Sequence, residues 1–375
     1  MHLFVYGTLC HRPLFDVVAG PADGLSPTVQ PARLAGHAVD QVAGSALPMI
    51  IERHDAVAQG NLWSGLSAAQ RARLDLYEVA FGYDLRVVTV LSASGEQVQA
   101  EAYFPPEDHR PAGKVWSLAE WERSQARAAI LTAQEMDNHA PPLTGPELFR
   151  QWKMMQGRAE AKVRAGQGAA AASLRYDAYP QDFDVSLRAP LSGDFFKLAQ
   201  VTIQHRTFAG QNSGPLPREV LVGCDAALVL PYDTVRDRVL LVEQFRTGPA
   251  VRHDSNPWSL EPVAGIVDPG ESPEEAALRE TGEEAGLSLT GLEKMFSIYP
   301  SPGSSTDHFH CFAGFADLDS LETGFGGLEH EAEDLRLHVL SLDDALALLD
   351  TGEINAGPLV AMLLWLARKR ASGWQ

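Results

Sequence analysis

The sequence predicts two mixed domains of the α+β / α/β class, one in each half of the chain, joined by a helical connector. Its 375 residues suffice for two or three domains. Strand-like apolar runs and helical patterns occur in both halves, whereas the middle carries one amphipathic helix and a small-residue linker. We therefore expect domains at 1–138 and 194–375, with 139–193 as connector and linker.

In the N-terminal half, the pattern favours short strands separated by helices. Residues 3–5 form an apolar run before a glycine turn, and β-rich runs follow at 86–91 and 98–104. Helical patterns cover 67–77 and 117–137. This order of elements predicts a small domain that contains both strands and helices.

The C-terminal half begins with strands and ends with helices. Residues 225–233 and 238–244 predict buried strands, and 309–315 predicts another. Helical patterns follow at 342–349 and 358–368. The connector helix shows an apolar stripe at helical spacing: Leu148, Trp152, Met155, Ala159 and Val163. After it, 166–172 is expected to be a small-residue linker and 179–190 to be irregular.

Composition argues against several classes of partner and compartment. A formal net charge of −19 disfavours nucleic acid, because binding its phosphates needs clusters of Lys and Arg. Three scattered cysteines are too few for a disulfide framework, and no apolar run reaches membrane-spanning length. Residues 1–9 predict a strand and turn rather than a secretion signal. We expect a cytoplasmic protein that binds neither nucleic acid nor membranes.

Residues 265–287 concentrate carboxylates on one loop and one helix. Ser272 is the expected N-cap of the helix, with Pro273 at its first position and Glu275 completing a capping box. A helix that begins there places several later glutamates on one face. The sequence therefore predicts where this helix begins and which residues form its acidic face.

That acidic face consists of Glu280, Glu283 and Glu284, spaced i, i+3 and i+4. Arg279, four residues before Glu283, can hold that carboxylate in place. Clustered oxygen ligands suit Mg²⁺ or Mn²⁺, which also bind substrate phosphates. The alternative is an ordinary acidic helix face exposed to solvent.

The segment resembles the Nudix box, a pattern of glycine and acidic residues at fixed spacing. The matching positions are Gly265, Glu271, Arg279, Glu280, Glu283, Glu284 and Gly286. Thr281 is the one departure, since the family has a bulky aliphatic residue there. The resemblance implies an α/β/α sandwich and metal-dependent hydrolysis of a nucleoside diphosphate linked to another group.

The flanking segments resemble bacterial ADP-ribose pyrophosphatases over about residues 195–370. The resemblance is carried by 218–220, 243–246, 258–261, 301–303 and 327–336. It implies a small nucleotide substrate, with ADP-ribose hydrolysed to AMP and ribose 5-phosphate. It also implies a homodimer, because the counterpart of Arg218 serves the site of the neighbouring subunit.

The same resemblance implies a role for each matching position. Glu280 and Glu284 would be metal ligands supported by Glu283, and the backbone carbonyl of Ala264 would be another ligand. As a metal ligand, Glu284 would also take part in catalysis.

The remaining roles concern proton transfer and substrate binding. Glu331 would be the base that activates the attacking water, while Glu333 in the same acidic run remains an alternative. The expected substrate contacts are Arg218, Arg246 and Glu261. For Arg246, a surface charge at a strand end is the alternative.

One stretch departs from the family pattern. Where the family has Ser-x-Glu-Arg after a Pro-Gly turn, residues 305–308 have a shorter acid, Asp307, and a neutral residue, His308. The change bears on substrate binding or water positioning. His308 and His310 also suggest a metal-binding pair, although a satisfied strand face is the simpler interpretation.

Three short motifs in the first half resemble the gamma-glutamyl cyclotransferase-like fold over about residues 1–138. They are Tyr6-Gly7-Thr8-Leu9, 74–78 and 83–87. The resemblance implies a small β-barrel with helices, and a glycine turn whose backbone N–H groups bind substrate. Glu78 would be the acid and base of the reaction, or else a buried structural carboxylate.

Together the halves resemble bacterial fusion proteins linked to tellurite resistance, although no residue indicates tellurium chemistry. Metal-dependent hydrolysis is the leading hypothesis for the activity. One alternative is a nucleotide-sensing module without turnover, which the intact carboxylate set disfavours. Another is a gamma-glutamyl cyclotransferase with an appended Nudix domain.

Overall fold

The computed structural model describes residues 2–22, 24, 26–167, 173–319, 321, 324–327 and 333–373. The chain divides into two compact units. The first comprises Met1–Phe195 and Thr202–Pro215, and the second comprises Phe196–Val201 and Leu216–Gln375. The expected connector therefore groups with the N-terminal unit.

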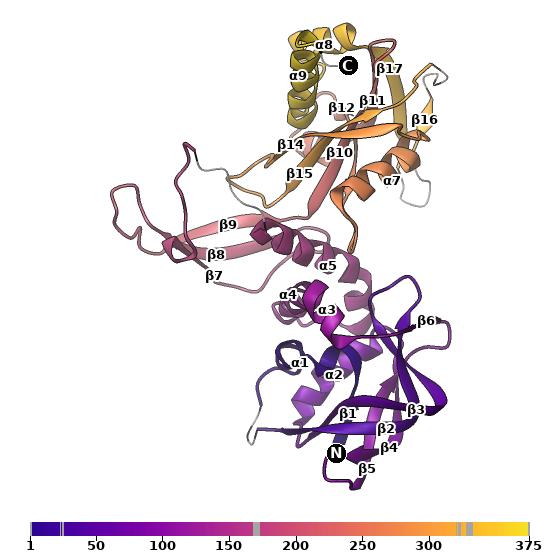
Figure 1. Ribbon diagram of the computed structural model, residues 1–375. Helices are drawn as coiled ribbons and strands as arrows, with labels where there is room; N and C mark the ends of the chain where they lie inside the picture. Colours follow the sequence, from indigo (N-terminus) through magenta and orange to yellow (C-terminus); the bar gives the residue numbers. More distant parts are fainter. Residues whose placement is uncertain are drawn as a thin grey trace. The chain divides into compact units, whose positions relative to one another are not determined.

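The first unit contains a closed β-barrel of five strands (Figure 1). They are β1 (His2–Val5), β2 (Thr28–Val42), β3 (Pro48–Ser64), β4 (Asp84–Ser92) and β5 (Gln97–Phe104). Their order is β3-β1-β5-β4-β2, and the ring closes because β2 also pairs with β3. Strand β6 (Pro111–Val115) extends from β2. The barrel expected from the sequence is confirmed.

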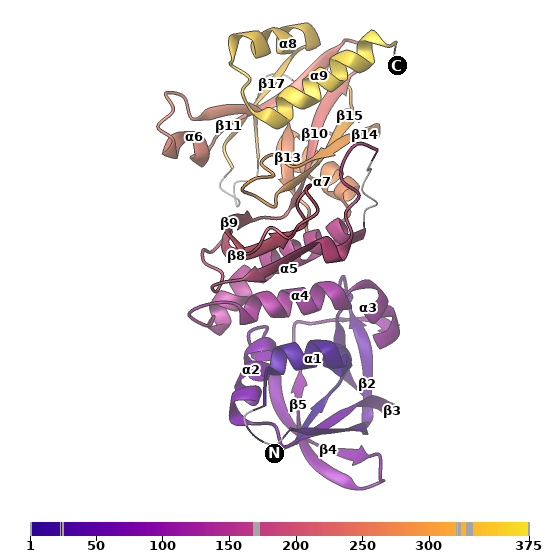
Figure 2. The ribbon, with the colours of Figure 1, turned by 90° about the vertical axis from the view of Figure 1, so that its left-hand side faces the viewer.

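Helices surround one side of this barrel: Figure 2 shows α1 and α2 beside its strands, and α4 packs on α1. They are η1 (Gly7–Cys10), α1 (Arg12–Ala19), α2 (Ala68–Val79), α3 (Leu118–Ser124), α4 (Ala126–Asp137) and α5 (Gly145–Gln167). Phe15 of α1 stacks on Trp63 of β3 with ring centroids 3.8 Å apart. Helix α5 is tied to α4 by a buried ion pair, in which Arg158 Nη2 lies 2.6 Å from the Glu135 carboxylate.

The helical pattern expected at 117–137 is confirmed as two helices, because the chain breaks at Gln125. This residue has φ −124° and ψ −23°, outside the helical region, and separates α3 from α4. Trp121 before the break and Ala126 after it are both buried in the same core cluster. The break allows each short helix to direct its own apolar side into that core.

The second unit is built on a mixed sheet of eight strands. They are β10 (Asp225–Asp233), β11 (Arg238–Phe245), β12 (Trp258–Glu261), β13 (Val263–Ile266), β14 (Gly291–Ile298), β15 (His308–Phe315), β16 (Phe325–Gly326) and β17 (Leu335–Ser341). The main order is β14-β15-β10-β11-β17-β16, with β12 on β11 and β13 on β10. Strands β10 and β15 run parallel, with residues 225–232 opposite 308–315.

Helices cover both faces of this sheet (Figure 1). Ala227 and Val229 of β10 pack with α7 (Pro273–Ala285), whereas Leu228 and Leu230 pack with α8 (Leu342–Thr351) and α9 (Gly357–Ala371). The alternation follows from the two-residue period of a strand. The α/β/α sandwich is thereby confirmed. A short helix, α6 (Thr247–Val251), follows β11.

A separate three-stranded sheet has the order β7-β8-β9. Its strands are β7 (Phe183–Leu187), β8 (Lys197–His205) and β9 (Leu216–Val222). The expectation of irregular chain up to Pro190 is therefore wrong for η2 (Pro180–Asp182) and for β7. Among the described residues, no helix is long and apolar enough to cross a membrane.

Candidate active site

Helix α7, which carries the acidic face, begins as the sequence predicts. The Ser272 hydroxyl accepts the N–H of Glu275 at 3.2 Å, and the Glu275 carboxylate accepts the N–H of Ser272 at 2.8 Å. Pro273 is the first helical residue, and Gly286 ends the helix in the left-handed conformation with φ 63°. Both ends of the helix are therefore fixed by local sequence.

Arg279 ties the acidic residues to one another. Its guanidinium donates to both oxygens of Glu271 at 3.0 and 2.9 Å, and to the Ile266 carbonyl at 3.1 Å. It also donates to Glu280 at 2.6 Å and to Glu283 at 2.9 Å. These carboxylates, Glu271 first, raise the pKa of Arg279. Arg279 therefore positions carboxylates, as expected from its spacing to Glu283.

Glu280 and Glu284 lie against strand β13. Glu284 is 2% exposed and accepts the N–H of Ala264 at 3.3 Å. Burial, followed by the charges of Glu333 and Glu280, raises the pKa of Glu284 to about 8. A Cβ atom at Gly265 would lie 1.8 Å from Glu280 Oε1, so only glycine permits this approach.

This donor set fits a hard divalent cation. Burial is the main cause of the raised pKa of both Glu280 and Glu284, so two negative charges at this site are stabilised poorly without a cation. Oxygen donors of this kind are what Mg²⁺ and Mn²⁺ bind. Ala264 adjoins Glu284 through its backbone, whereas Glu283 is turned to Arg279 and more exposed.

Arg246 and Glu261 form a two-pronged ion pair at 2.9 and 2.5 Å. Glu261 is the main cause of the raised pKa of Arg246, and Glu284 and Glu333 contribute, which places the pair beside the carboxylates of α7. Glu333 thus adjoins the cluster, while Glu331 lies outside the described residues.

The other expected contacts lie elsewhere in the second unit. Arg218 is an exposed residue of β9 whose guanidinium donates to the Pro217 carbonyl at 2.8 Å. Within the described chain, no hydrogen bond or ion pair joins it to the carboxylates of α7. Asp307 accepts the Ser305 hydroxyl at 2.6 Å and lies against Gly223, where a Cβ atom would come within 1.7 Å.

The first unit brings Glu78 together with aromatic hydroxyls. Glu78 lies near the end of α2, and its charge contributes to the raised pKa values of Tyr6, Tyr77, Tyr83 and Tyr103. Burial raises the pKa of Glu78 itself to about 7. Tyr6, Tyr77 and Tyr83 belong to the three motifs that carry the resemblance, whereas Tyr103 lies outside them and had no signal in the sequence.

The glycine turn adjoins Glu78 through Tyr6. The Tyr6 hydroxyl donates to the Tyr103 carbonyl at 2.7 Å. Gly7 has φ +70°, and a Cβ there would lie 2.3 Å from Pro48. Thr8 is partly buried, and the Leu9 side chain is 3% exposed in the core, so Leu9 can offer a ligand only its backbone.

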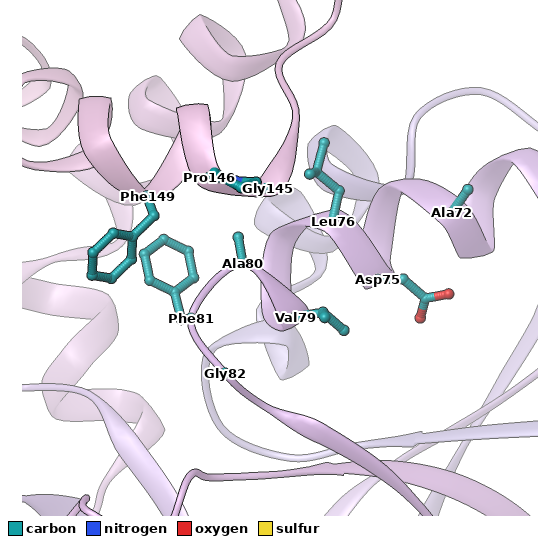
Figure 3. Close-up of a pocket in the computed structure, with 10 residues that line it drawn as sticks. All are labelled: Ala72, Asp75, Leu76, Val79, Ala80, Phe81, Gly82, Gly145, Pro146 and Phe149. Carbon is teal, nitrogen blue, oxygen red and sulfur yellow. The ribbon is translucent and has the colours of Figure 1, made fainter.

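A groove of about 750 Å³ lies beside α2 and the first turn of α5 (Figure 3). Its lining is Ala72, Asp75, Leu76, Val79, Ala80, Phe81, Gly82, Gly145, Pro146 and Phe149. The Asp75 carboxylate already accepts the Tyr103 hydroxyl at 2.6 Å and Arg71 Nε at 2.8 Å. The groove is therefore apolar and includes neither Glu78 nor the glycine turn.

Comparisons with known proteins match a different family to each of the two units. A "NUDIX domain" model matches residues 224–363, and a "Gamma-glutamyl cyclotransferase, AIG2-like" model matches residues 3–123. An ADP-ribose pyrophosphatase of Haemophilus influenzae is 40% identical over 189 residues, which is 50% of this chain and 86% of that protein.

Two further relatives extend the comparison. An ADP-ribose pyrophosphatase of Escherichia coli K12 is 38% identical over 185 residues, covering 49% of this chain and 88% of that protein. A GDP-mannose pyrophosphatase of Pectobacterium atrosepticum is 34% identical over 146 residues, covering 39% and 74%. These relatives are matched over most of their length, and the carboxylates gather on α7. The chain therefore belongs to the Nudix family: it is a pyrophosphatase that hydrolyses nucleoside diphosphates, and it carries an N-terminal cyclotransferase-like domain.

Proposed function

We propose that the second unit hydrolyses ADP-ribose to AMP and ribose 5-phosphate. The observation that carries this substrate is the 40% identity to a protein named ADP-ribose pyrophosphatase, against 34% to one named GDP-mannose pyrophosphatase. The geometry of α7 is consistent with it, because buried carboxylates beside Arg246 combine sites for a cation and for an anionic substrate.

Glu280, Glu284 and the Ala264 carbonyl would hold Mg²⁺ or Mn²⁺. When bound, such an ion neutralises the diphosphate and lowers the pKa of water. Glu283, held by Arg279 at 2.9 Å, supports the two ligands. In this proposal the ligands hold the ion at a partly buried site, where electrostatic interactions are stronger than in bulk water.

Arg246, held by Glu261, would contact the substrate phosphates, and Arg218 would reach the site of a second subunit. Water attacks one phosphorus atom, the bridging P–O bond breaks, and the bridging oxygen leaves with one of the two products. A carboxylate removes the proton from the attacking water. The resemblance favours Glu331, and the position of Glu333 beside the cluster supports it as the alternative.

A substrate panel tests the proposal. The purified chain with Mg²⁺ is incubated with ADP-ribose, GDP-mannose and other nucleoside diphosphate sugars, and a coupled phosphatase reports the monophosphates released. We expect the highest kcat/KM with ADP-ribose. Faster turnover of GDP-mannose would refute the substrate, and binding of ADP-ribose without turnover would favour the nucleotide-sensing alternative.

Two variants test the site. Glu280→Gln and Glu284→Gln should each lower kcat by orders of magnitude while the protein still folds, because each removes a charged metal ligand. Glu274→Gln is the matched control, since Glu274 is an exposed carboxylate of the same helix. Near-normal turnover in both site variants would overturn the assignment.

We also propose that the chain works as a homodimer in the cytoplasm. The dimer follows from the role that the resemblance gives to Arg218, whose exposed guanidinium is available to a second subunit. The compartment is supported by the three cysteines, Cys10, Cys224 and Cys311, which are all free thiols, as is usual in reducing compartments.

A second activity is proposed for the first unit, because Glu78 has its pKa raised to about 7 beside the glycine turn. Glu78 would take a proton from the α-amine of a gamma-glutamyl amine as that nitrogen attacks the γ-carbonyl carbon. The C–N bond to the departing amine breaks, and Glu78 returns the proton to it, leaving 5-oxoproline. Glu78→Gln should abolish 5-oxoproline release and leave ADP-ribose hydrolysis unchanged. Absence of 5-oxoproline with the unaltered chain would favour a binding or assembly role.

A further inference from the structure

Away from the carboxylates of α7, the second unit brings an aspartate and two histidines together at one end of its sheet. Asp225 begins β10, and His308 and His310 lie at the start of β15. The parallel register sets Asp225 opposite His308 and Ala227 opposite His310. Because side chains alternate along a strand, all three project from the same face. One nitrogen or oxygen of each lies within 4.8 Å of the others.

The distance between two of these groups suits a shared metal ion. His310 Nε2 lies 3.1 Å from Asp225 Oδ2, and both residues are more than nine-tenths buried. In a tetrahedral zinc site with bonds of about 2.0–2.1 Å, neighbouring ligand atoms are about 3.3 Å apart. The observed separation therefore needs only a small adjustment to accommodate an ion.

The orientation of the His310 ring is fixed from its other side. His310 Nδ1 lies 3.2 Å from the Ser297 hydroxyl on the neighbouring strand β14. A hydrogen bond at the second ring nitrogen is the usual companion of a metal-binding histidine, because it sets the ring orientation and the tautomer. Ser297 would play this supporting role.

His308 supplies the third group from a more accessible position. Its ring lies 4.9 Å from that of His310 and 4.7 Å from that of Tyr299. Burial lowers the pKa of His308, and the neighbouring His310 and Lys294 lower it further, while Asp225 opposes them. Neutral imidazole is the form that binds metal ions.

We propose that Asp225, His308 and His310 form a site for a zinc-class transition-metal ion, with a fourth position open to water or another ligand. Two imidazoles and one carboxylate are donors that suit Zn²⁺ or Co²⁺ better than Mg²⁺. The site differs from that of α7 in its donors and its place, because Asp225 lies two residues along β10 from Ala227, the partner of Gly265, against which Glu280 lies. This corresponds to about 7 Å along a strand.

Cobalt provides a direct readout of such a site. The full chain is first saturated with Mg²⁺, which occupies the oxygen-rich site of α7, and Co²⁺ is then added. We expect the visible absorption bands of four-coordinate Co²⁺ with a stoichiometry of one per chain, and loss of these bands when Zn²⁺ displaces the cobalt. Zn²⁺ should also raise the melting temperature, because a ligand of the native state stabilises it.

Variants then locate the ion. His308→Ala removes a ligand and should weaken Zn²⁺ binding by at least about 100-fold. Ser297→Ala removes only a supporting residue and should weaken it by about 10-fold. His54→Ala, at an exposed histidine of the first unit, and Glu284→Gln should both retain the cobalt bands. His308 is the primary target because it is less buried than His310 and its removal is less disruptive.

Two outcomes would overturn the proposal. If the bands persist in His308→Ala but disappear in Glu284→Gln, the ion occupies the site of α7. If the Mg²⁺-saturated chain takes up neither Co²⁺ nor Zn²⁺, the pair of His310 and Asp225 is a structural hydrogen bond.

Discussion

Replacing Glu78 by Gln should stabilise the first unit at alkaline pH and change it little at acidic pH. A carboxyl whose pKa is higher in the folded than in the unfolded chain binds more protons when folded. Its pKa is raised from 4.5 to about 7, so the wild-type chain loses stability as the pH rises between these values. Glutamine does not titrate and avoids that loss.

The size of the effect follows from the difference in pKa. The shift to about 7 corresponds to roughly 3 kcal/mol of unfolding free energy once the pH exceeds the folded value. Glu78 keeps partial contact with solvent, which reduces the gain that we expect to about 1–2 kcal/mol. For a unit of this size, the gain raises the melting temperature by about 2–8 °C.

Calorimetry of the full chain at about pH 5 and about pH 8.5 measures this gain. The transition of the first unit should move upward in Glu78→Gln at the higher pH and by much less at the lower one. Glu96→Gln, at an exposed glutamate in the turn between β4 and β5, is the control and should show no such dependence. An equal shift of Glu78→Gln at both values would refute burial as the cause.

Three further predictions concern the second unit. Gly265→Ala should lower kcat and raise the Mg²⁺ concentration for half-maximal activity by about 10-fold or more, because the added methyl group displaces Glu280. The control is Gly282→Ala on α7, the helix that carries Glu280, because a methyl group there meets open space. A Mg²⁺ titration compares the two variants. Arg279→Lys should cost about 10-fold in kcat, since one ammonium cannot replace a fork that holds three carboxylates; steady-state kinetics with unchanged activity would contradict that role. Light scattering at micromolar concentration should give the mass of a dimer, and a fully active monomer would rule out the role across subunits proposed for Arg218.

The elements with strong local signals were predictable from the sequence. Helix α7 begins with a capping box at Ser272, and strand β10 covers the apolar run 225–233. In contrast, the long strands β2 and β3 gave no clear pattern. Strand β2 contains Pro31 and is bent by a bulge near Gly36, while the middle of β3 is exposed and polar. Their pairing in the barrel, rather than their composition, makes them strands.

The candidate sites also differ in how far the sequence alone could predict them. The carboxylates of α7 are neighbours along one helix, so helical spacing alone brings them together. Asp225 and His308 are 83 residues apart and meet only through the register of two parallel strands. Glu78 of α2 and Tyr6 after β1 likewise meet only through long-range packing, and a shared motif rather than spacing pointed to both. Long-range register is the information that a single sequence does not display.

Strand β1 has a consequence for handling the protein. Its four residues, His2–Val5, lie between β3 on one side and β5 on the other. If they were removed, both neighbours would present unpaired N–H and C=O groups, and such edges recruit strands from other chains. We therefore expect a chain that lacks residues 2–5 to aggregate before any loss of ligand binding is seen. A purification tag is better attached at the C-terminal end.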